Sequence, residues 1–321
     1  MILIVSNERD SASDLFVESL KKRDLSFQRL NTDVLMTDAS FNIGVGVGSV
    51  NHLTQYGRDI DLNKIDSVWY RRPVLPKLKI NSVVEKKFAE RESLATMDAL
   101  WVSLVDKFWV SSPYAIKDAS SKFQQLLVAE ELGFNIPETL ITNDVDKVSE
   151  FFESCHGLML YKSVTTGHLS SVSAKTQLMT YSRKIEATDL SKMVLVKNCP
   201  GMFQKYIEKE HEIRATVIGE KVFSAKIDSQ KYPEKRVDWR KGRYIKEIFS
   251  VIEIPRSLEI MLVNFMRRFG LQFGAFDLIA DKKGNFVFLE CNPNGEWAWV
   301  EDCTKMPMTN ALIDLLINKS C

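Results

Sequence analysis

Three oxygen-bearing side chains near the C-terminus, Asp277, Glu290 and Asn292, have the types and spacing of a magnesium site. Hard oxygen ligands without a histidine favour Mg²⁺ over zinc. Mg²⁺ usually takes one or two protein carboxylates and leaves its other positions to water and substrate phosphates. The alternative is structural, with Asp277 ending a strand and Asn292 beginning a turn. That alternative does not explain a glutamate within the apolar run FVFLECN at 286–292.

The two segments that carry these side chains are predicted to form a β-hairpin. Apolar runs flank the sequence DKKG at 281–284, which is typical of a hairpin turn. If the turn centres on its two lysines, Asp277 pairs with Phe288. Glu290 and Asn292 then follow at two-residue steps, so that all three ligands share one face of the sheet.

Lys122 and Lys162 are candidate phosphate ligands, because a lysine point charge commonly binds phosphate. Lys162 ends an apolar strand predicted at 157–162. The loop from Thr165 to Gly167 follows it and could fold over phosphates with backbone N–H groups. Taken alone, however, a lysine at a strand end is more often a solvated residue that protects a sheet edge.

The segment FQKYIE at 203–208, followed by Glu212 and Arg214, is predicted to be extended. Such a segment can act as a hinge between two lobes and hydrogen-bond the edge of a purine through its main chain. An ordinary amphipathic strand is the alternative, and the segment alone favours that alternative.

Two groups of cations are candidates for contact with an acidic substrate. Residues 226–246 include eight cations and three anions around Trp239 and Arg240, and the local charge of +5 suits a polyphosphate or an acidic peptide. Arg71 and Arg72 end a short apolar strand, where paired guanidinium groups could hold a carboxylate bidentately. In both cases the alternative is a solvated basic surface.

The elements that must position these groups alternate between strands and helices. Apolar runs at 1–5 and 67–70 predict buried strands, and a helical pattern extends from 83 to 110. The sequence SSP at 111–113 indicates a domain boundary, and short strands dominate beyond residue 193. We therefore predict an α/β (α+β) fold. Its predicted domains are residues 1–113, 114–200 and 201–321.

Composition excludes several classes of function. The chain has 321 residues, of which 45% are hydrophobic and 26% charged, as expected for a globular protein with a sizeable core. Its net charge of +1 argues against a general nucleic-acid binder, and no run approaches the roughly 18 apolar residues of a membrane span. The N-terminus lacks the basic region of a secretory signal. The five cysteines form no C-x-x-C pair, so we expect reduced thiols in the cytoplasm rather than disulfides or zinc.

The order of these motifs along the chain resembles that of the ATP-grasp ligases. It runs from Ser121-Lys122 through GFNIPETLITN, Lys162, FQKYIEKEHEIR and VDWR to FGAFDLI and LECNPN, and covers roughly residues 113–305. The strings WYRRP at 69–73 and CNPNGEWAW at 291–299 are similar to those of the graspetide ligases, the ATP-grasp maturases of microviridin-type ribosomal peptides. The resemblance implies an N-terminal Rossmann-like pre-ATP-grasp domain, a central lid domain and a C-terminal ATP-grasp domain.

The resemblance also implies roles for individual residues. The nucleotide-binding residues of the family correspond to Lys122, Lys162, Gln204, Lys205, Tyr206, Ile207 and Glu208. Its ligands for two Mg²⁺ ions correspond to Asp277, Glu290 and Asn292. Its arginines that face the γ-phosphate or the substrate carboxylate correspond to Arg214 and Arg240. Arg71 and Arg72 are expected to contact substrate. The chain departs from the family at Ser121, where an asparagine is common, and at Glu296, where glutamine is expected.

The activity that the resemblance implies is ATP-dependent macrocyclisation of a ribosomal precursor peptide. Asp or Glu side chains of the peptide would be activated as acyl phosphates and attacked by Ser, Thr or Lys side chains, while a leader segment docks separately. The expected cofactors are ATP and Mg²⁺, and the expected assembly is a homodimer. One alternative is a ligase that adds a free amino acid, such as glutamate, to a protein or small acceptor. Another is a nucleotide-binding subunit without catalysis, which the intact set of acidic ligands argues against.

Overall fold

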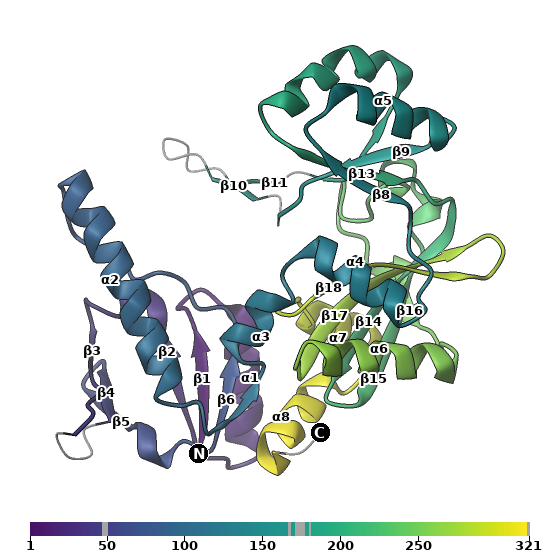
Figure 1. Cartoon of the computed structure of the whole chain (residues 1–321). Helices are drawn as coiled ribbons and strands as arrows, with labels where there is room; N and C mark the ends of the chain where they lie inside the picture. The colour runs from purple at the N-terminus through teal and green to yellow at the C-terminus, as the bar shows by residue number, and fades with distance from the viewer. Residues whose placement is uncertain (47–50, 166–167, 171–176, 180, 320–321) are drawn as a thin grey trace.

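The computed structural model describes residues 1–46, 51–165, 168–170, 177–179 and 181–319. Two residues of the predicted phosphate loop, Thr166 and Gly167, lie outside the described residues. Figure 1 shows a three-part arrangement, in which an N-terminal α/β part lies beside a C-terminal sheet and a smaller part lies above that sheet. Among the described residues, no helix combines the length and apolarity needed to cross a membrane. The predicted domain limits and homodimer stay predictions.

The N-terminal part is built on a parallel sheet with the strand order β2-β1-β6-β7. Its strands are β1 Ile2–Ser6, β2 Phe27–Asn31, β6 Ser67–Tyr70 and β7 Phe108–Val110. A three-stranded antiparallel sheet comprises β3 Ala39–Asn42, β4 His52–Gln55 and β5 Arg58–Asp61. The helices of this part are α1 Ser11–Lys22, α2 Val83–Val102 and α3 Pro113–Asp118. The strands predicted at 1–5 and 67–70 are confirmed.

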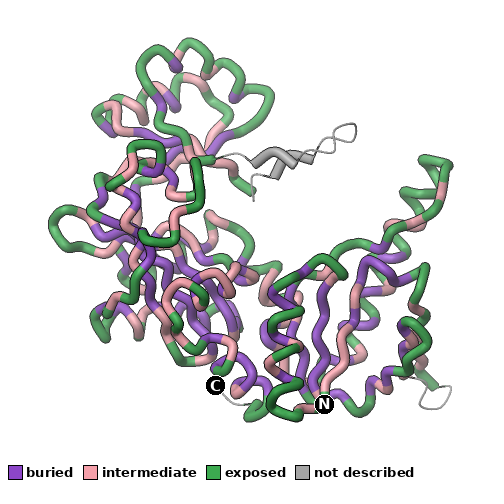
Figure 2. The backbone as a smooth tube through the Cα atoms, turned by 180° about the vertical axis from the view of Figure 1, so that it is seen from behind, coloured by how far each residue is buried: buried purple, intermediate pink, exposed green. Residues whose placement is uncertain are grey.

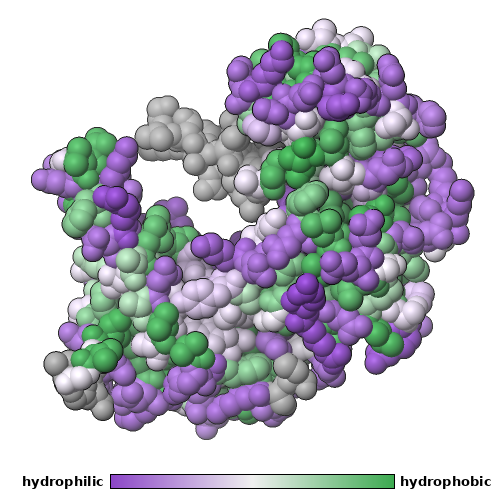
Figure 3. Space-filling view, in the orientation of Figure 1, coloured by the Kyte–Doolittle hydropathy of each residue, from purple (hydrophilic) through white to green (hydrophobic). Residues whose placement is uncertain are grey.

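The helix predicted at 83–110 is too long. It ends at Val102, and Trp109 lies in β7 instead. Trp109 packs edge-on against Trp101, so burial of these large rings explains the apolar residues that continue the helical pattern. The N-terminal half of α2 stands clear of the sheet and is exposed (Figure 2). Figure 3 shows the molecular surface hollowed between this end of α2 and the central and C-terminal parts of the chain.

The central part is a four-stranded antiparallel sheet with the order β12-β9-β13-β8. Its strands are β8 Thr139–Thr142, β9 Met159–Lys162, β12 Arg183–Ile185 and β13 Gly201–Lys205. α5 Val145–Ser154 covers it, together with a 3-10 segment at Ala187–Lys197. A short hairpin comprises β10 His168–Ser170 and β11 Gln177–Met179. The strand predicted before Lys162 is confirmed as β9.

The C-terminal part is a five-stranded antiparallel sheet with the order β16-β15-β14-β17-β18. Its strands are β14 Lys209–Ile218, β15 Lys221–Ile227, β16 Phe249–Val251, β17 Phe273–Asp281 and β18 Phe286–Asn292. Its helices are α4 Lys122–Glu131, α6 Arg256–Arg268, α7 Ala298–Thr304 and α8 Met308–Asn318. Buried residues of α4 and α6 form one core with the apolar face of β14, β17 and β18.

The predicted hairpin is confirmed, but its predicted register is wrong. Asp277 pairs with Glu290, whereas Phe288 pairs with Leu278. A β-bulge causes the difference, because Leu289 is an extra residue on β18 opposite Asp277. Without the bulge, Glu290 would alternate onto the core face that Phe288 occupies. The bulge therefore places the two carboxylates directly opposite each other.

The N-terminal and C-terminal parts share a hydrophobic core. Ile4 and Trp69 of the parallel sheet belong to the same buried cluster as Trp297, and as Leu312 of α8. The four-stranded sheet has a separate core that includes Val148, Met159 and Phe203. The parallel sheet and the five-stranded sheet therefore pack against each other through one core, whereas the four-stranded sheet has a core of its own.

Candidate active site

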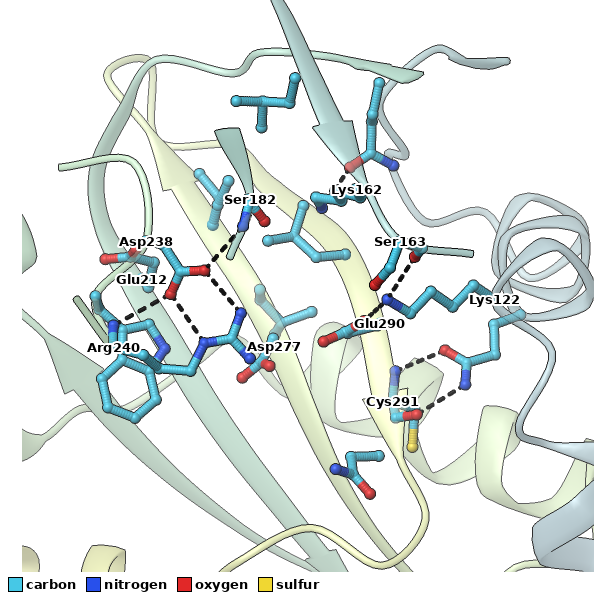
Figure 4. Close-up of a pocket in the computed structure, with 18 of the residues that line it drawn as sticks. Lys122, Lys162, Ser163, Ser182, Glu212, Asp238, Arg240, Asp277, Glu290 and Cys291 are labelled. Atoms are coloured by element: carbon cyan, nitrogen blue, oxygen red, sulfur yellow. Dashed lines mark hydrogen bonds and ion pairs between the residues drawn. The ribbon is translucent and has the colours of Figure 1, made fainter. Parts of the chain in front are cut away.

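A cavity of about 410 Å³ lies between the four-stranded and five-stranded sheets. β9 and β13 contribute to one wall, and β17 and β18 contribute to the other. The structure brings most of the predicted site residues to this cavity: Lys122, Lys162, Gln204, Lys205, Tyr206, Ile207, Arg240, Asp277, Glu290 and Asn292. Figure 4 shows the charged members of this set converging from different elements.

Lys122 reaches the cavity from the first turn of α4. The Ser121 hydroxyl accepts a hydrogen bond from the Gln124 N–H, so this serine serves as the N-cap of α4. The Lys122 amino group lies 3.4 Å from a Glu290 carboxylate oxygen and donates to the Ser163 carbonyl at 3.2 Å. It is thus held at the acidic end of the cavity (Figure 4).

Lys162 is half-buried at the end of β9, where its amino group donates to the Gln204 side-chain oxygen at 2.6 Å. Gln204 is itself buried and fixed by a 2.9 Å bond to the Thr139 hydroxyl. Burial lowers the pKa of Lys162 to about 8, although the negative charge of Glu290 opposes this shift. Lys162 is therefore a cation without a directly bonded carboxylate, which suits it to an anionic ligand.

The two carboxylates of the bulged hairpin are surrounded by cations. Asp277 accepts a 2.7 Å hydrogen bond from Arg214, and Glu290 faces Lys122. Burial alone would raise the pKa of Glu290, but the charges of Lys122 and Lys162 hold it below its ordinary value. Glu290 is therefore available in the charged form that metal coordination requires.

Asn292 ends the acidic segment and begins a tight turn. Its side-chain oxygen accepts from the Asn294 N–H at 3.0 Å, and its carbonyl accepts from the Gly295 N–H at 3.1 Å. Gly295 is required by close packing, because a Cβ there would lie 2.4 Å from the Ala275 Cβ. The turn thus lies tightly against β17 beside the carboxylates.

The oxygen donors fit Mg²⁺ with coordination positions left for another ligand. Within the part of the chain that the structure describes, no three His, Cys, Asp or Glu side chains gather closely enough to hold a metal alone. Asp277, Glu290 and Asn292 offer two carboxylates and one amide, and the cavity that they border has room for phosphates. This set agrees with the sequence prediction of an ion shared between protein and substrate.

Arg240 also lines the cavity, where Asp238 holds its guanidinium group in a bidentate pair with hydrogen bonds of 2.8 and 2.9 Å. The Asp238 carboxylate also accepts from the Ser182 N–H. Burial alone would lower the pKa of Arg240, but the hydrogen bonds with Asp238 raise it. Figure 4 shows the guanidinium between Asp238 and Asp277, directed into the cavity.

The predicted adenine hinge connects the two sheets that border the cavity. Lys205 ends β13, and Tyr206 and Ile207 continue toward β14. The Lys205 N–H donates to the Glu138 carbonyl and the Tyr206 N–H donates to the Leu158 carbonyl, so the segment is fixed on one side by the smaller sheet. Its place at the cavity suits the predicted role, which stays a prediction.

Four predicted site residues lie away from the cavity lining, namely Glu208, Arg214, Arg71 and Arg72. Glu208 pairs with Lys282 at 2.8 Å on the exposed hairpin turn, and its expected place near a ribose stays a prediction. Arg214 is buried and donates to the Asp277 carboxylate at 2.7 Å, and its predicted role stays a prediction.

The structure also separates Arg71 from Arg72. The Arg71 side chain is only 1% exposed, and it donates to the carbonyls of Asn294 and Gly295 at 2.8 and 3.1 Å. Both arginines pair with Glu296, at 2.8 Å for Arg71 and 2.6 Å for Arg72. Arg72 is 42% exposed and remains accessible, whereas Arg71 is enclosed by protein. The expected substrate contact therefore stays a prediction for Arg72, and the structure corrects it for Arg71.

Sequence reasoning missed several residues that line the cavity. Glu212 is buried and pairs with Lys209, and it also accepts a hydrogen bond from Ser229. Burial raises the pKa of Glu212, although Lys209 opposes the shift. Gln125 was missed as well. The signal for Lys209 and Glu212 was their polar character within an otherwise buried strand.

Comparisons with known proteins agree with this fold. The family model described as the MvdD pre-ATP grasp domain matches residues 1–117. Among solved structures, macrocyclase MdnC bound with precursor peptide MdnA from Microcystis aeruginosa MRC is 25% identical, covers 100% of both chains and has a TM-score of 0.88. A RiPP-associated ATP-grasp ligase from Chryseobacterium gregarium, in complex with ADP and a leader and core peptide, is 26% identical over 100% of this chain and 97% of that chain, with a TM-score of 0.91. Macrocyclase MdnB from Microcystis aeruginosa MRC is 29% identical over 98% of each chain, with a TM-score of 0.82. A search of curated protein sequences finds no match.

The fold is that of the ATP-grasp ligases, and residues 1–117 match a pre-ATP-grasp domain. Within that class, the chain is similar over its whole length to enzymes described as macrocyclases and RiPP-associated ligases. These findings confirm the resemblance that the order of motifs predicted.

Proposed function

We propose that the protein is an ATP- and Mg²⁺-dependent ligase that closes macrocycles in a ribosomal precursor peptide. Asp or Glu side chains of the peptide are joined to Ser or Thr hydroxyls as esters, or to Lys amines as amides. The observation that carries the proposal is the cavity in which Lys122, Lys162 and Arg240 surround Asp277 and Glu290. It is supported by whole-length similarity to a ligase solved with ADP and with leader and core peptides.

The proposed chemistry follows from the low reactivity of a carboxylate. A carboxylate oxygen attacks the γ-phosphorus of ATP, the bond to the bridging oxygen breaks, and ADP leaves. The hydroxyl or amine of the same peptide then attacks the acyl carbon, and inorganic phosphate leaves with the former carboxylate oxygen. The nucleophile loses one proton, so each ring forms with the net loss of one water from the peptide.

The protein's contribution is positioning and charge neutralisation. Lys122 and Lys162 would hold the phosphate chain, and Asp277, Glu290 and Asn292 would hold Mg²⁺, which supplies further positive charge when bound. Arg240 is fixed by Asp238 in the lining of the cavity, where it would face the transferred group or the peptide carboxylate. Arg72 offers a second, accessible guanidinium for the acidic peptide.

A mass measurement distinguishes macrocyclisation from addition of a free amino acid. The purified protein is incubated with ATP, Mg²⁺ and a leader-bearing peptide rich in Thr, Ser, Asp and Glu. Macrocyclisation lowers the peptide mass by one water per ring, whereas addition of glutamate raises it. An increase in mass that depends on a free amino acid would contradict the proposal.

The matched control is Glu290→Gln, which removes one anionic metal ligand with little change of shape. This variant is expected to keep the circular dichroism spectrum of the wild type and to leave the peptide mass unchanged. Wild-type turnover by Glu290→Gln would refute the assignment of this cavity as the metal site.

A further inference from the structure

The buried side chain of Gln125 makes three hydrogen bonds beside the proposed metal site. Gln125 is only 3% exposed. Its amide nitrogen donates to the carbonyls of Ala119 at 2.6 Å and Cys291 at 2.7 Å. Its amide oxygen accepts from the Cys291 N–H at 2.7 Å. A single side chain therefore pairs with both backbone groups of the residue between Glu290 and Asn292 (Figure 4).

These bonds replace a missing neighbouring strand. β18 is the edge strand of the five-stranded sheet, so the peptide groups on its outer side have no strand to bond with. Cys291 is buried, and unpaired backbone groups in a buried position are costly. The amide of Gln125 satisfies both groups as a further strand would, and it holds this part of β18 against α4.

The bulge explains why an edge contact is needed here. Before the bulge, Asn135 covers the outer edge, because its carbonyl accepts from the Phe288 N–H at 2.8 Å and its side chain donates to the Phe286 carbonyl at 3.1 Å. The extra residue, Leu289, then changes which backbone groups face outward. Cys291 becomes the outward-facing residue beyond the bulge, and Gln125 is the side chain that covers it.

The same helix carries a proposed phosphate ligand. Lys122 and Gln125 are one turn apart on α4, and Lys122 also contacts the Glu290 carboxylate. α4 therefore touches the acidic segment twice, once through a side-chain charge and once through the backbone. A shift of β18 along α4 would displace Glu290 from Lys122 and from Asp277.

We propose that Gln125 is a positioning residue that fixes the backbone of β18 so that Glu290 and Asn292 present their oxygens to Mg²⁺. This inference rests on the proposed function, since it assigns the role of those two residues to metal binding. Outer residues that orient metal ligands typically change metal affinity about 10- to 100-fold when they are replaced. Gln125 bonds the two peptide units that link Cys291 to Glu290 and to Asn292, so it acts on two ligands at once and we expect an effect in that range.

The test measures ADP binding by calorimetry at a series of Mg²⁺ concentrations. Gln125→Met keeps the length of the side chain but removes all three bonds. It should raise the Mg²⁺ concentration needed for half-maximal enhancement of ADP binding by about 10- to 100-fold, with little change in ADP affinity without Mg²⁺. Gln125→Glu retains the acceptor for the Cys291 N–H but loses the donor, and it should give a smaller shift in the same direction.

Asn135→Ala is the matched control, because it removes a side-chain bond to the same strand on the other side of the bulge. It is expected to lower the denaturation midpoint while leaving the Mg²⁺ requirement at the wild-type value. An equal shift in Asn135→Ala and Gln125→Met would overturn the positioning role, since general loosening of β18 would then explain both.

Failure of this inference can be distinguished from failure of the proposed function. If the wild type binds ADP with no dependence on Mg²⁺, the proposed function and the role of Gln125 both fall. If the wild type shows the dependence and both Gln125 variants match it, the role of Gln125 alone is refuted. If Gln125→Met does not fold, Gln125→Glu gives the deciding value.

Discussion

At the scale of single residues, the lowered pKa of Lys162 predicts that nucleotide binding depends on pH. Burial lowers the pKa of its amino group to about 8, so in the free protein it loses its positive charge as the pH rises through that value. Phosphate favours the charged form, and ADP affinity should therefore fall between about pH 7 and about pH 9 by up to tenfold per pH unit. Lys162→Met, which has no charge at any pH, should bind weakly across the range without this decline. Titrations of both proteins check the prediction, and parallel pH profiles would contradict it.

The two adjacent arginines are expected to differ in their effects. Arg71→Met leaves the Glu296 and Asp10 carboxylates without their buried partner, which should lower the free energy of unfolding by about 3 kcal/mol or more. Arg72→Ala removes an exposed ion pair and should lower it by less than about 1 kcal/mol. If Arg72 contacts the peptide, its variant should form fewer rings with unchanged ADP affinity. Denaturant unfolding and ring counts on the same preparations test both statements, and equal destabilisation by the two variants would show that the burial difference is unimportant.

At the scale of elements, substitution of Gly295 in the turn after β18 should destabilise the protein, and a second substitution at Ala275 should restore its stability. Gly295→Ala introduces a Cβ 2.4 Å from the Ala275 Cβ, so the turn must move away from β17 at an expected cost of about 1–3 kcal/mol. Because the carbonyl of Gly295 accepts from Arg71, the shift should also weaken the contact with the N-terminal sheet. The double variant Gly295→Ala/Ala275→Gly restores space and should recover much of the stability. A double variant as unstable as Gly295→Ala alone would rule out this contact as the cause.

In the hairpin of β17 and β18, the sequence predicted that the strands pair but did not predict the β-bulge. Alternating apolar residues and the turn sequence at 281–284 were sufficient to predict β17, β18 and their pairing. Nothing in the residue types marked Leu289 as an extra residue, because a leucine fits a regular strand and a bulge equally well. The predicted grouping of Asp277 with Glu290 is present in the structure although the register proposed for it was wrong.

At the scale of the whole molecule, the shared core predicts that the parallel and five-stranded sheets lose structure together. Leu312 of α8 is fully buried in this core, and Leu312→Ala should cost about 2–5 kcal/mol. Hydrogen exchange should then show reduced protection in β1 and β14 alike, with a smaller effect in β9, which has a separate core. Loss of protection confined to β14 would contradict a common folding unit.

The whole-chain arrangement also explains which site residues sequence could identify. Lys122, Lys162 and the acidic hairpin have charges that are conspicuous at the ends of apolar segments. The ion pairs of Glu208 with Lys282 and of Arg71 with Glu296 join segments that are distant in sequence, so the residue types alone did not indicate them. The order of the motifs predicted which segments meet at the cavity. Which residues of those segments pair with one another could be seen only in the folded structure.

Activation of a peptide carboxylate by phosphoryl transfer can be followed by oxygen-isotope tracing. A leader-bearing substrate peptide is prepared with isotopically labelled oxygen in its Asp and Glu side-chain carboxylates, and the phosphate released during ring formation is analysed by mass spectrometry. An acyl phosphate intermediate should leave one labelled oxygen in inorganic phosphate for each ring closed, and Glu290→Gln should give no labelled phosphate. Rings that form while the phosphate remains unlabelled would contradict the account, because the oxygen displaced from the peptide would then not come from an acyl phosphate.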